Sequence, residues 1–137
     1  MISDDDGTIR WRQLWDDTAA LTGRAEARWL CEEASGYFGG EFIDAFDVSA
    51  SERSVAHLDA MLARVQAGEP LQYVLGHWSF RRLDLLVDRR VLIPRPETEL
   101  VAERALALIR QLADERVDST PLFVADLGTG SGAIGLS

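Results

Sequence analysis

The sequence predicts an α/β protein that begins with a small α-helical bundle, continues into a β-hairpin and ends with the start of a second domain. Three observations support this fold class. Apolar residues recur at helical spacing from Arg10 to Ala67, strand formers dominate from Leu71 to Ile93, and an apolar run at residues 122–125 leads into a glycine-rich turn. We therefore expect a helical domain at residues 1–70, a hairpin linker at 71–93 and the incomplete beginning of a further domain at 94–137.

The composition narrows the class of protein. The 137 residues carry a formal net charge of −9, and all fourteen basic residues are arginines. An acidic chain is poorly suited to a broad phosphate-binding surface, so we expect no direct nucleic-acid partner. The lone cysteine, Cys31, excludes an internal disulfide framework and sits in an apolar helical pattern typical of a buried thiol. No apolar run approaches the ~20 residues of a membrane-spanning helix, so we predict a cytoplasmic protein without a membrane partner.

The helical domain should contain three main helices. Gly68 ends the third, and Pro70 prevents it from resuming. An aromatic stretch at residues 37–46 is interrupted by two glycines and predicts a turn and a short helix beneath the bundle. The three helices are predicted at Arg10–Leu21, at Arg24–Ser35, and from a capping box at Ser49–Glu52 to about Ala67.

The linker should be a hairpin, because the residues from Leu71 onward are rich in strand formers. A hairpin turn is expected near Arg81–Arg82 and a second turn at residues 88–90. A further helix should then run from Pro96 to about Ala113, since proline suits the first helical turn. One face of that helix should carry Val101, Ala105, Leu108 and Leu112.

The glycine-rich turn after the apolar run is the first candidate site. Gly128, Gly130 and Ala133 fit a dinucleotide-binding pattern, which is weak evidence by itself. However, Asp126 lies two residues before the first glycine, where its carboxylate would repel a pyrophosphate. A cationic ligand such as S-adenosylmethionine is a better partner. A dinucleotide-dependent oxidoreductase and a tight turn without a ligand stay open as alternatives.

The second candidate site is the stretch Pro94–Glu99. Two prolines force an extended approach to the helix, and the acidic residues complement its dipole. A well-capped helix start would explain most of this pattern. Arg95, a cation held between two prolines, is unusual for capping alone and suggests a functional role.

Three segments in order carry a family resemblance: Gly68–Gly76, Leu92–Glu99 and Asp126–Ile134. Together they resemble the N-terminal portion of the release-factor glutamine N5-methyltransferases, the HemK/PrmC family. The resemblance implies an N-terminal helical domain that grips the release factor, a β-hairpin linker and a class I, Rossmann-like methyltransferase domain. It implies S-adenosylmethionine as cofactor and peptide chain release factors as partners. The implied reaction methylates the glutamine side-chain amide in their Gly-Gly-Gln motif.

The resemblance also assigns residues. It implies that the residues close to the cofactor or substrate are Arg95, Pro96, Glu97 and Thr98. It implies that the cofactor-binding residues are Asp126, Gly128, Thr129, Gly130, Ser131 and Gly132. No catalytic residue and no metal site are expected here, because the family's Asn-Pro-Pro-Tyr signature is absent from the 137 residues.

We expect the Rossmann-like domain to be truncated after its first strand and glycine loop. Such a chain should bind S-adenosylmethionine weakly or not at all and should not turn over by itself. Residues 122–137 should be poorly ordered, swapped or paired with another chain, so the incomplete sheet is expected to allow self-association. A non-catalytic module that binds a release factor is the alternative function from another class.

Overall fold

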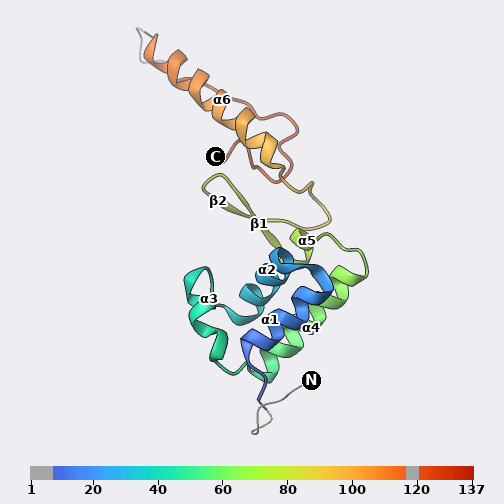
Figure 1. Ribbon diagram of the computed structural model, residues 1–137. Helices are drawn as coiled ribbons and strands as arrows, with labels where there is room; N and C mark the ends of the chain where they lie inside the picture. Colours follow the sequence, from blue (N-terminus) through green and yellow to red (C-terminus); the bar gives the residue numbers. More distant parts are fainter. Residues whose placement is uncertain (1–7, 117–120) are drawn as a thin grey trace. The chain divides into compact units, whose positions relative to one another are not determined.

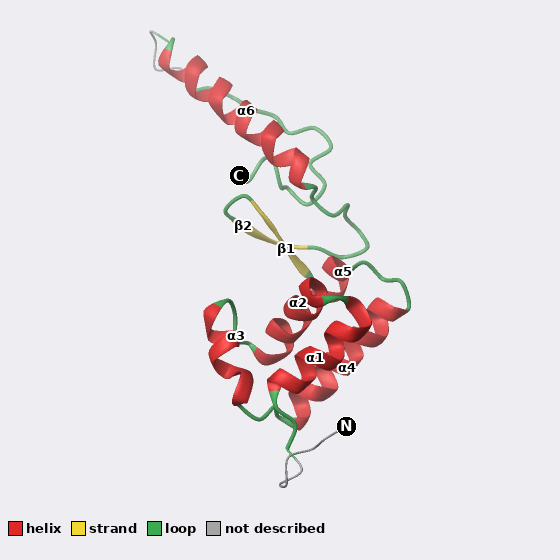
Figure 2. Ribbon diagram, viewed as in Figure 1, coloured by secondary structure: helices red, strands yellow, loops and turns green. Residues whose placement is uncertain are grey.

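The computed structural model describes residues 8–116 and 121–137, which form two compact units (Figure 1). The first unit ends at Leu75 and the second begins at Gly76. The first unit contains α1 (Trp11–Thr22), α2 (Arg24–Ser35), α3 (Gly40–Asp44), the 3-10 helix η1 (Ala45–Asp47), α4 (Glu52–Gln66) and α5 (Leu71–Leu75). The second contains β1 (His77–Phe80), β2 (Leu83–Leu86) and α6 (Pro96–Asp114), and Figure 2 distinguishes these strands from the helices.

The first two helices confirm the predicted helical spacing. α1 and α2 are separated by the single residue Gly23, whose φ of 89° is readily adopted by glycine. Gly36 ends α2 in the left-handed conformation, with φ at 74°, and its N–H donates to the carbonyl of Glu32. α1 therefore turns back on α2 with almost no connecting loop, and the two helices pack against each other.

The helical unit has a core of its own, and aromatic rings form one end of it. Phe42 meets Trp11 and Phe46 edge-to-face at centroid distances of 6.3 and 5.2 Å, and Trp15 stacks on Phe46 at 5.4 Å. Each such pair contributes ~0.5–1.5 kcal/mol beyond the apolar area that it buries. The core is completed by the buried side chains of Leu14, Leu30, Cys31, Ala34, Leu58, Met61, Leu71 and Val74.

The start of α4 corrects the predicted capping box. Ser51, rather than Ser49, is the N-cap, and its Oγ accepts a hydrogen bond from the N–H of Ser54 at 3.1 Å. Ser49 instead forms an isolated antiparallel bridge with Arg10. Both serines satisfy the capping preference, so the sequence pattern alone does not decide between them.

Residues 71–75 form a helix, so the expectation of strand structure from Leu71 was wrong. Leu71 and Val74 stand three residues apart on one helical face, and both are buried in the core of the first unit. The guanidinium of Arg64 donates to the carbonyls of Tyr73 and Val74 at 2.9 and 3.1 Å, which stabilises the end of this short helix. Burial and this cap therefore outweigh the strand propensity of the segment.

The hairpin is confirmed, and its turn lies at Arg81–Arg82 as predicted. β1 and β2 are antiparallel, and Trp78 is paired with Leu85 and Phe80 with Leu83. These four side chains share one face of the pleat, on which Phe80 and Leu85 are buried. The second predicted turn is also present, since the N–H of Val91 donates to the carbonyl of Asp88 at 3.1 Å.

The long helix α6 begins at Pro96 as predicted, and its apolar face is exposed. Ala102 is its buried residue, whereas Val101, Leu108 and Leu112 are 58, 43 and 51% exposed. Helical periodicity determines which residues share a face. Burial also requires a packing partner, and in the described part of the chain no element covers this face fully.

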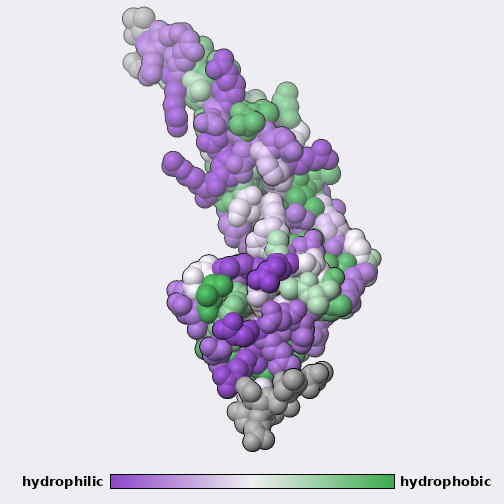
Figure 3. All heavy atoms as spheres, viewed as in Figure 1, coloured by the Kyte–Doolittle hydropathy of each residue, from purple (hydrophilic) through white to green (hydrophobic). Residues whose placement is uncertain are grey.

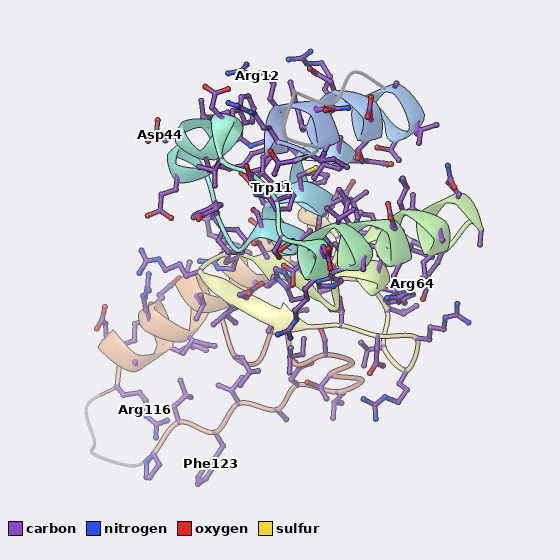
Figure 4. The ribbon with its side chains drawn as sticks, turned by 90° about the horizontal axis from the view of Figure 1, so that it is seen from below. Trp11, Arg12, Asp44, Arg64, Arg116 and Phe123 are labelled. Atoms are coloured by element: carbon purple, nitrogen blue, oxygen red, sulfur yellow. The ribbon has the colours of Figure 1, made fainter. Side chains whose placement is uncertain are left out.

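Residues 122–125 do not form the predicted strand. The structure assigns no strand to them, and Phe123 and Val124 are 89 and 64% exposed. Figure 4 shows the Phe123 ring pointing away from the neighbouring backbone. A strand needs a hydrogen-bonded neighbour, and no described segment pairs with this one.

Candidate functional site

The glycine loop is a bend built from left-handed backbone. Gly128, Gly130 and Gly132 have φ values of 76, 55 and 81°. Residues with a Cβ rarely adopt these angles, so the alternate glycines are required by the backbone path. A Cβ on Gly128 would meet no atom within 4 Å, and one on Gly130 would meet only the Gly128 carbonyl, at 3.9 Å. The loop therefore leaves its main chain open to a ligand.

Asp126 closes the base of this loop. Its Oδ2 accepts hydrogen bonds from the Thr129 hydroxyl at 3.2 Å and from the Gly135 N–H at 3.0 Å. A Cβ on Gly135 would lie 3.0 Å from that same oxygen, so a larger residue would push the carboxylate aside by a few tenths of an ångström. The structure thus brings Asp126 and Thr129 together and adds Gly135, which the sequence analysis did not select.

The residues after the loop form a single helical turn. The N–H of Leu136 donates to the carbonyl of Gly132 at 2.9 Å, and Ala133 is buried. A Cβ on Gly132 would lie only 2.9 Å from Leu136 Cδ1. Gly132 is therefore favoured by its φ angle, whereas the exposed Leu136 side chain could move aside for a Cβ. The turn matches the predicted helix start without being assigned as a helix.

The second candidate stretch leads into α6. Arg95 is the N-cap, with extended backbone angles and no side-chain capping bond, and its carbonyl accepts from the Thr98 N–H at 3.0 Å. Pro94 is buried, whereas Arg95, Pro96 and Glu97 are exposed. The start of α6 therefore carries an exposed cation, Arg95, and an exposed acid, Glu97.

Glu99 connects this stretch to the hairpin. Its carboxylate accepts from the Arg81 N–H at 3.0 Å, and its carbonyl accepts from the Arg81 guanidinium at 3.2 Å. Arg81 has a φ of 54°, which is unusual for a residue with a side chain. A pocket of about 370 Å³ lies beside this contact, lined by Arg81, Arg82, Pro96, Glu99, Leu100 and Glu103.

Sequence reasoning missed this pocket because it treated Arg81 only as a turn residue. The available signal was the absence of glycine or asparagine from a tight hairpin turn. A non-glycine residue forced to positive φ needs compensating contacts, which Glu99 supplies here. No hydrogen bond joins the Pro94–Glu99 stretch to the glycine loop within residues 8–116 and 121–137.

Other chemistry-bearing groups are separate from both candidate sites. Burial raises the pKa of the Cys31 thiol to about 12, so at neutral pH it is protonated and unreactive. Over the ranges that the structure describes, no three potential ligands gather where a metal ion could be held. Nor does any helix in those ranges have the length and apolar character needed to cross a membrane.

Comparison with known proteins first shows what the helical unit is similar to. Residues 18–76 match the family model described as the PrmC N-terminal domain. This range covers most of the helical unit and ends where the hairpin begins.

Individual relatives extend the similarity towards the C-terminus. The chain is 38% identical over 120 residues to the release factor glutamine methyltransferase of Escherichia coli, which covers 87% of the chain and 40% of that protein. For the Haemophilus influenzae protein of the same name, the identity is 37% over 116 residues, covering 83% of the chain and 38% of the relative.

A third relative has the same name. The Lactococcus lactis release factor glutamine methyltransferase is 44% identical over 87 residues, covering 64% of the chain and 29% of that protein. The resemblance drawn from the sequence is thus confirmed: this chain is related to the N-terminal portion of the release factor glutamine methyltransferases. It spans about two fifths of the length of the Escherichia coli and Haemophilus influenzae proteins.

Proposed function

We propose that this protein takes part in S-adenosylmethionine-dependent methylation of a glutamine side-chain amide, the one in the Gly-Gly-Gln motif of peptide chain release factors. Relatives named as release factor glutamine methyltransferases support the reaction class. The observation that carries the cofactor assignment is the glycine loop, in which an acid precedes three glycines at positive φ. The setting of the reaction would be the cytoplasm.

The loop residues suit a cationic cofactor. The open backbone at Gly128 and Gly130 allows a ligand to approach the main chain without meeting a side chain. Asp126 uses Oδ2 to hold the loop, and within the described residues its Oδ1 accepts no hydrogen bond. A free carboxylate oxygen here favours a ligand with an ammonium or sulfonium group and disfavours a pyrophosphate. S-adenosylmethionine would supply the methyl group.

The substrate amide needs groups beyond this loop. An amide nitrogen is a poor nucleophile, so its methylation depends on holding the nitrogen in line with the methyl group. The family resemblance gives that task to an asparagine side chain and a proline carbonyl, and the 137 residues contain no asparagine. We therefore propose that the 137-residue chain by itself does not turn over and binds the cofactor weakly or not at all.

Methyl transfer to a purified release factor tests the proposal, using the protein as the cell makes it. We expect the release factor to gain the mass of one methyl group, located by tandem mass spectrometry on the glutamine of Gly-Gly-Gln. A release factor with alanine at that glutamine is the matched control and should gain none. Methylation elsewhere, or none with an intact substrate, would refute the assignment.

Calorimetric titration tests the cofactor separately from the substrate. The same protein is titrated with S-adenosylmethionine and, in parallel, with NAD. Heat from S-adenosylmethionine alone is the expected outcome. Uptake of NAD in its place would overturn the cofactor assignment and favour a dinucleotide-dependent oxidoreductase.

A non-catalytic release-factor-binding module is the second candidate. The helical unit favours it, because this unit has a complete core and a surface that needs no cofactor to form. Release-factor binding by the 137-residue chain without S-adenosylmethionine is expected under both candidates. If the protein as the cell makes it binds a release factor but does not methylate it, the non-catalytic binding module is the correct candidate.

A further inference from the structure

The connection between α2 and α3 presents two aromatic side chains to solvent. Tyr37 and Phe38 are 39 and 53% exposed, and they lie between Gly36 and Gly39. Both glycines have positive φ, at 74 and 59°, so the chain bends sharply on each side of the aromatic pair. The two neighbouring rings offer apolar area that binding to another molecule would remove from water.

An ion pair on α2 fixes the backbone of this loop. Glu32 Oε1 accepts from the Gly39 N–H at 3.0 Å, and Arg28 Nη2 donates to the Gly39 carbonyl at 2.6 Å. Arg28 Nε also donates to Glu32 Oε1 at 2.8 Å. On the other side, Ser35 Oγ accepts from the Tyr37 N–H at 3.1 Å. The loop is thus held in one conformation before any partner arrives, which lowers the entropy cost of binding.

Ile43 extends the apolar surface onto α3. With Gly39 as N-cap, Phe38 and Ile43 occupy the N′ and N4 positions, the spacing of a hydrophobic staple. Ile43 is 46% exposed, whereas its neighbour Phe42 is fully buried and anchors the helix in the core. Figure 3 shows hydrophobic side chains gathered over α3 among hydrophilic ones.

Two acids on α3 border this apolar surface. Glu41 and Asp44 are exposed, and neither pairs with a cation within the described residues. Figure 4 shows Asp44 at the outer side of α3. We call Tyr37, Phe38, Ile43, Glu41 and Asp44 together the aromatic-loop surface.

The charge of the helical unit indicates what this surface binds. Residues 8–75 contain six arginines against eleven aspartates and glutamates, a net charge of −5 with His57 neutral. Such a field repels nucleic acid and anionic lipid and attracts a basic protein surface. The fitting partner therefore offers an apolar recess surrounded by arginine or lysine.

We propose that the aromatic-loop surface docks on a basic, apolar-centred surface of the release factor, an inference that rests on the proposed function. Phe38 is the central anchor, because aromatic residues on rigid supports dominate binding energies at protein interfaces. Glu41 and Asp44 increase the association rate and select against partners without basic groups.

Binding of the 137-residue chain to a purified release factor tests the proposal. Phe38→Ala should weaken binding by at least about tenfold, as expected for an aromatic anchor. Leu21→Ala is the matched control, since Leu21 is 61% exposed on α1 outside the surface, and binding should change less than about twofold. Glu41→Gln with Asp44→Asn should also weaken binding and flatten its dependence on salt.

The outcomes separate this proposal from the one on which it rests. Far-UV circular dichroism should be unchanged in all variants, because the substituted side chains lie outside the core. A release factor that binds Phe38→Ala and Leu21→Ala equally well would overturn the docking surface and leave the proposed function standing. Failure of the wild-type chain to bind would overturn the docking surface, whereas the proposed function is decided separately by methyl transfer with the protein as the cell makes it. A Phe38-dependent dimer of this chain, or Phe38-dependent capture by phosphatidylglycerol vesicles, would also overturn the assignment.

Discussion

Replacing Arg64 tests the contact that holds the last helix of the first unit. Arg64 Nε and Nη2 donate to the two carboxylate oxygens of Glu69 at 2.8 and 3.0 Å, and Nη1 and Nη2 donate to the carbonyls of Val74 and Tyr73. The Glu69 side chain is 10% exposed and that of Arg64 is 45% exposed. Arg64→Met removes all four hydrogen bonds and keeps most of the aliphatic stem.

The expected loss follows from these contacts. Hydrogen bonds to a charged group contribute ~1.5–3 kcal/mol each, but the four share one half-exposed guanidinium and are not additive. We therefore expect the free energy of unfolding of the helical unit to fall by about 2 kcal/mol, with the melting temperature lower by about 10 °C. Urea unfolding followed by far-UV circular dichroism measures this change.

A matched arginine on the same helix provides the control. Arg53 is exposed on α4 and makes no hydrogen bond or ion pair within the described residues, so Arg53→Met should change stability by less than about 0.5 kcal/mol. If Arg64→Met destabilises no more than Arg53→Met, the contact contributes nothing measurable. The account of why residues 71–75 are helical would then have to rest on burial alone.

Three further predictions concern the glycine loop, a turn and the core. Residue 132 has a φ of 81°, and a Cβ there would lie 2.9 Å from Leu136 Cδ1. Gly132→Ala should therefore strain the turn and accelerate hydrogen exchange at the Leu136 amide. The Arg90 guanidinium beside Asp88 lowers the pKa of that carboxyl to about 2. The stabilisation of the folded state by this ion pair is therefore present at neutral pH and is lost as the pH falls through about 2. Arg90→Ala should move the Asp88 midpoint upward in an NMR titration, and an unchanged midpoint would contradict this cause. The Cys31 thiol, whose pKa burial raises to about 12, should react with an aromatic disulfide reagent at neutral pH only as fast as the protein unfolds.

Much of the helical unit could be predicted because its signals are local. The separation of α1 from α2 at Gly23 and the left-handed end of α2 at Gly36 follow from the properties of glycine at single positions. The hairpin turn at Arg81–Arg82 could likewise be placed between two runs of strand formers. Such features depend on residues within a few positions of each other, which a single sequence displays directly.

The errors occur where two local signals compete. Ser49 and Ser51 both suit an N-cap, and the backbone chooses Ser51 because Ser49 bridges to Arg10. Residues 71–75 contain good strand formers, yet burial in the helical core and the Arg64 cap make them a helix. In both cases the deciding contact comes from a residue distant in sequence, and periodicity contains no information about it.

The candidate site shows the same division between residue choice and geometry. The alternate glycines could be selected from the sequence, because positive φ is a property of the residue itself. The bond from Gly135 to Asp126 spans nine residues and that from Arg81 to Glu99 spans eighteen, so neither could be predicted from spacing. Packing has the same limit, as the exposed face of α6 and the unpaired run at residues 122–125 show. An amphipathic pattern identifies surfaces that can be buried. It does not identify the segment that buries them, because that segment can lie anywhere else in the sequence.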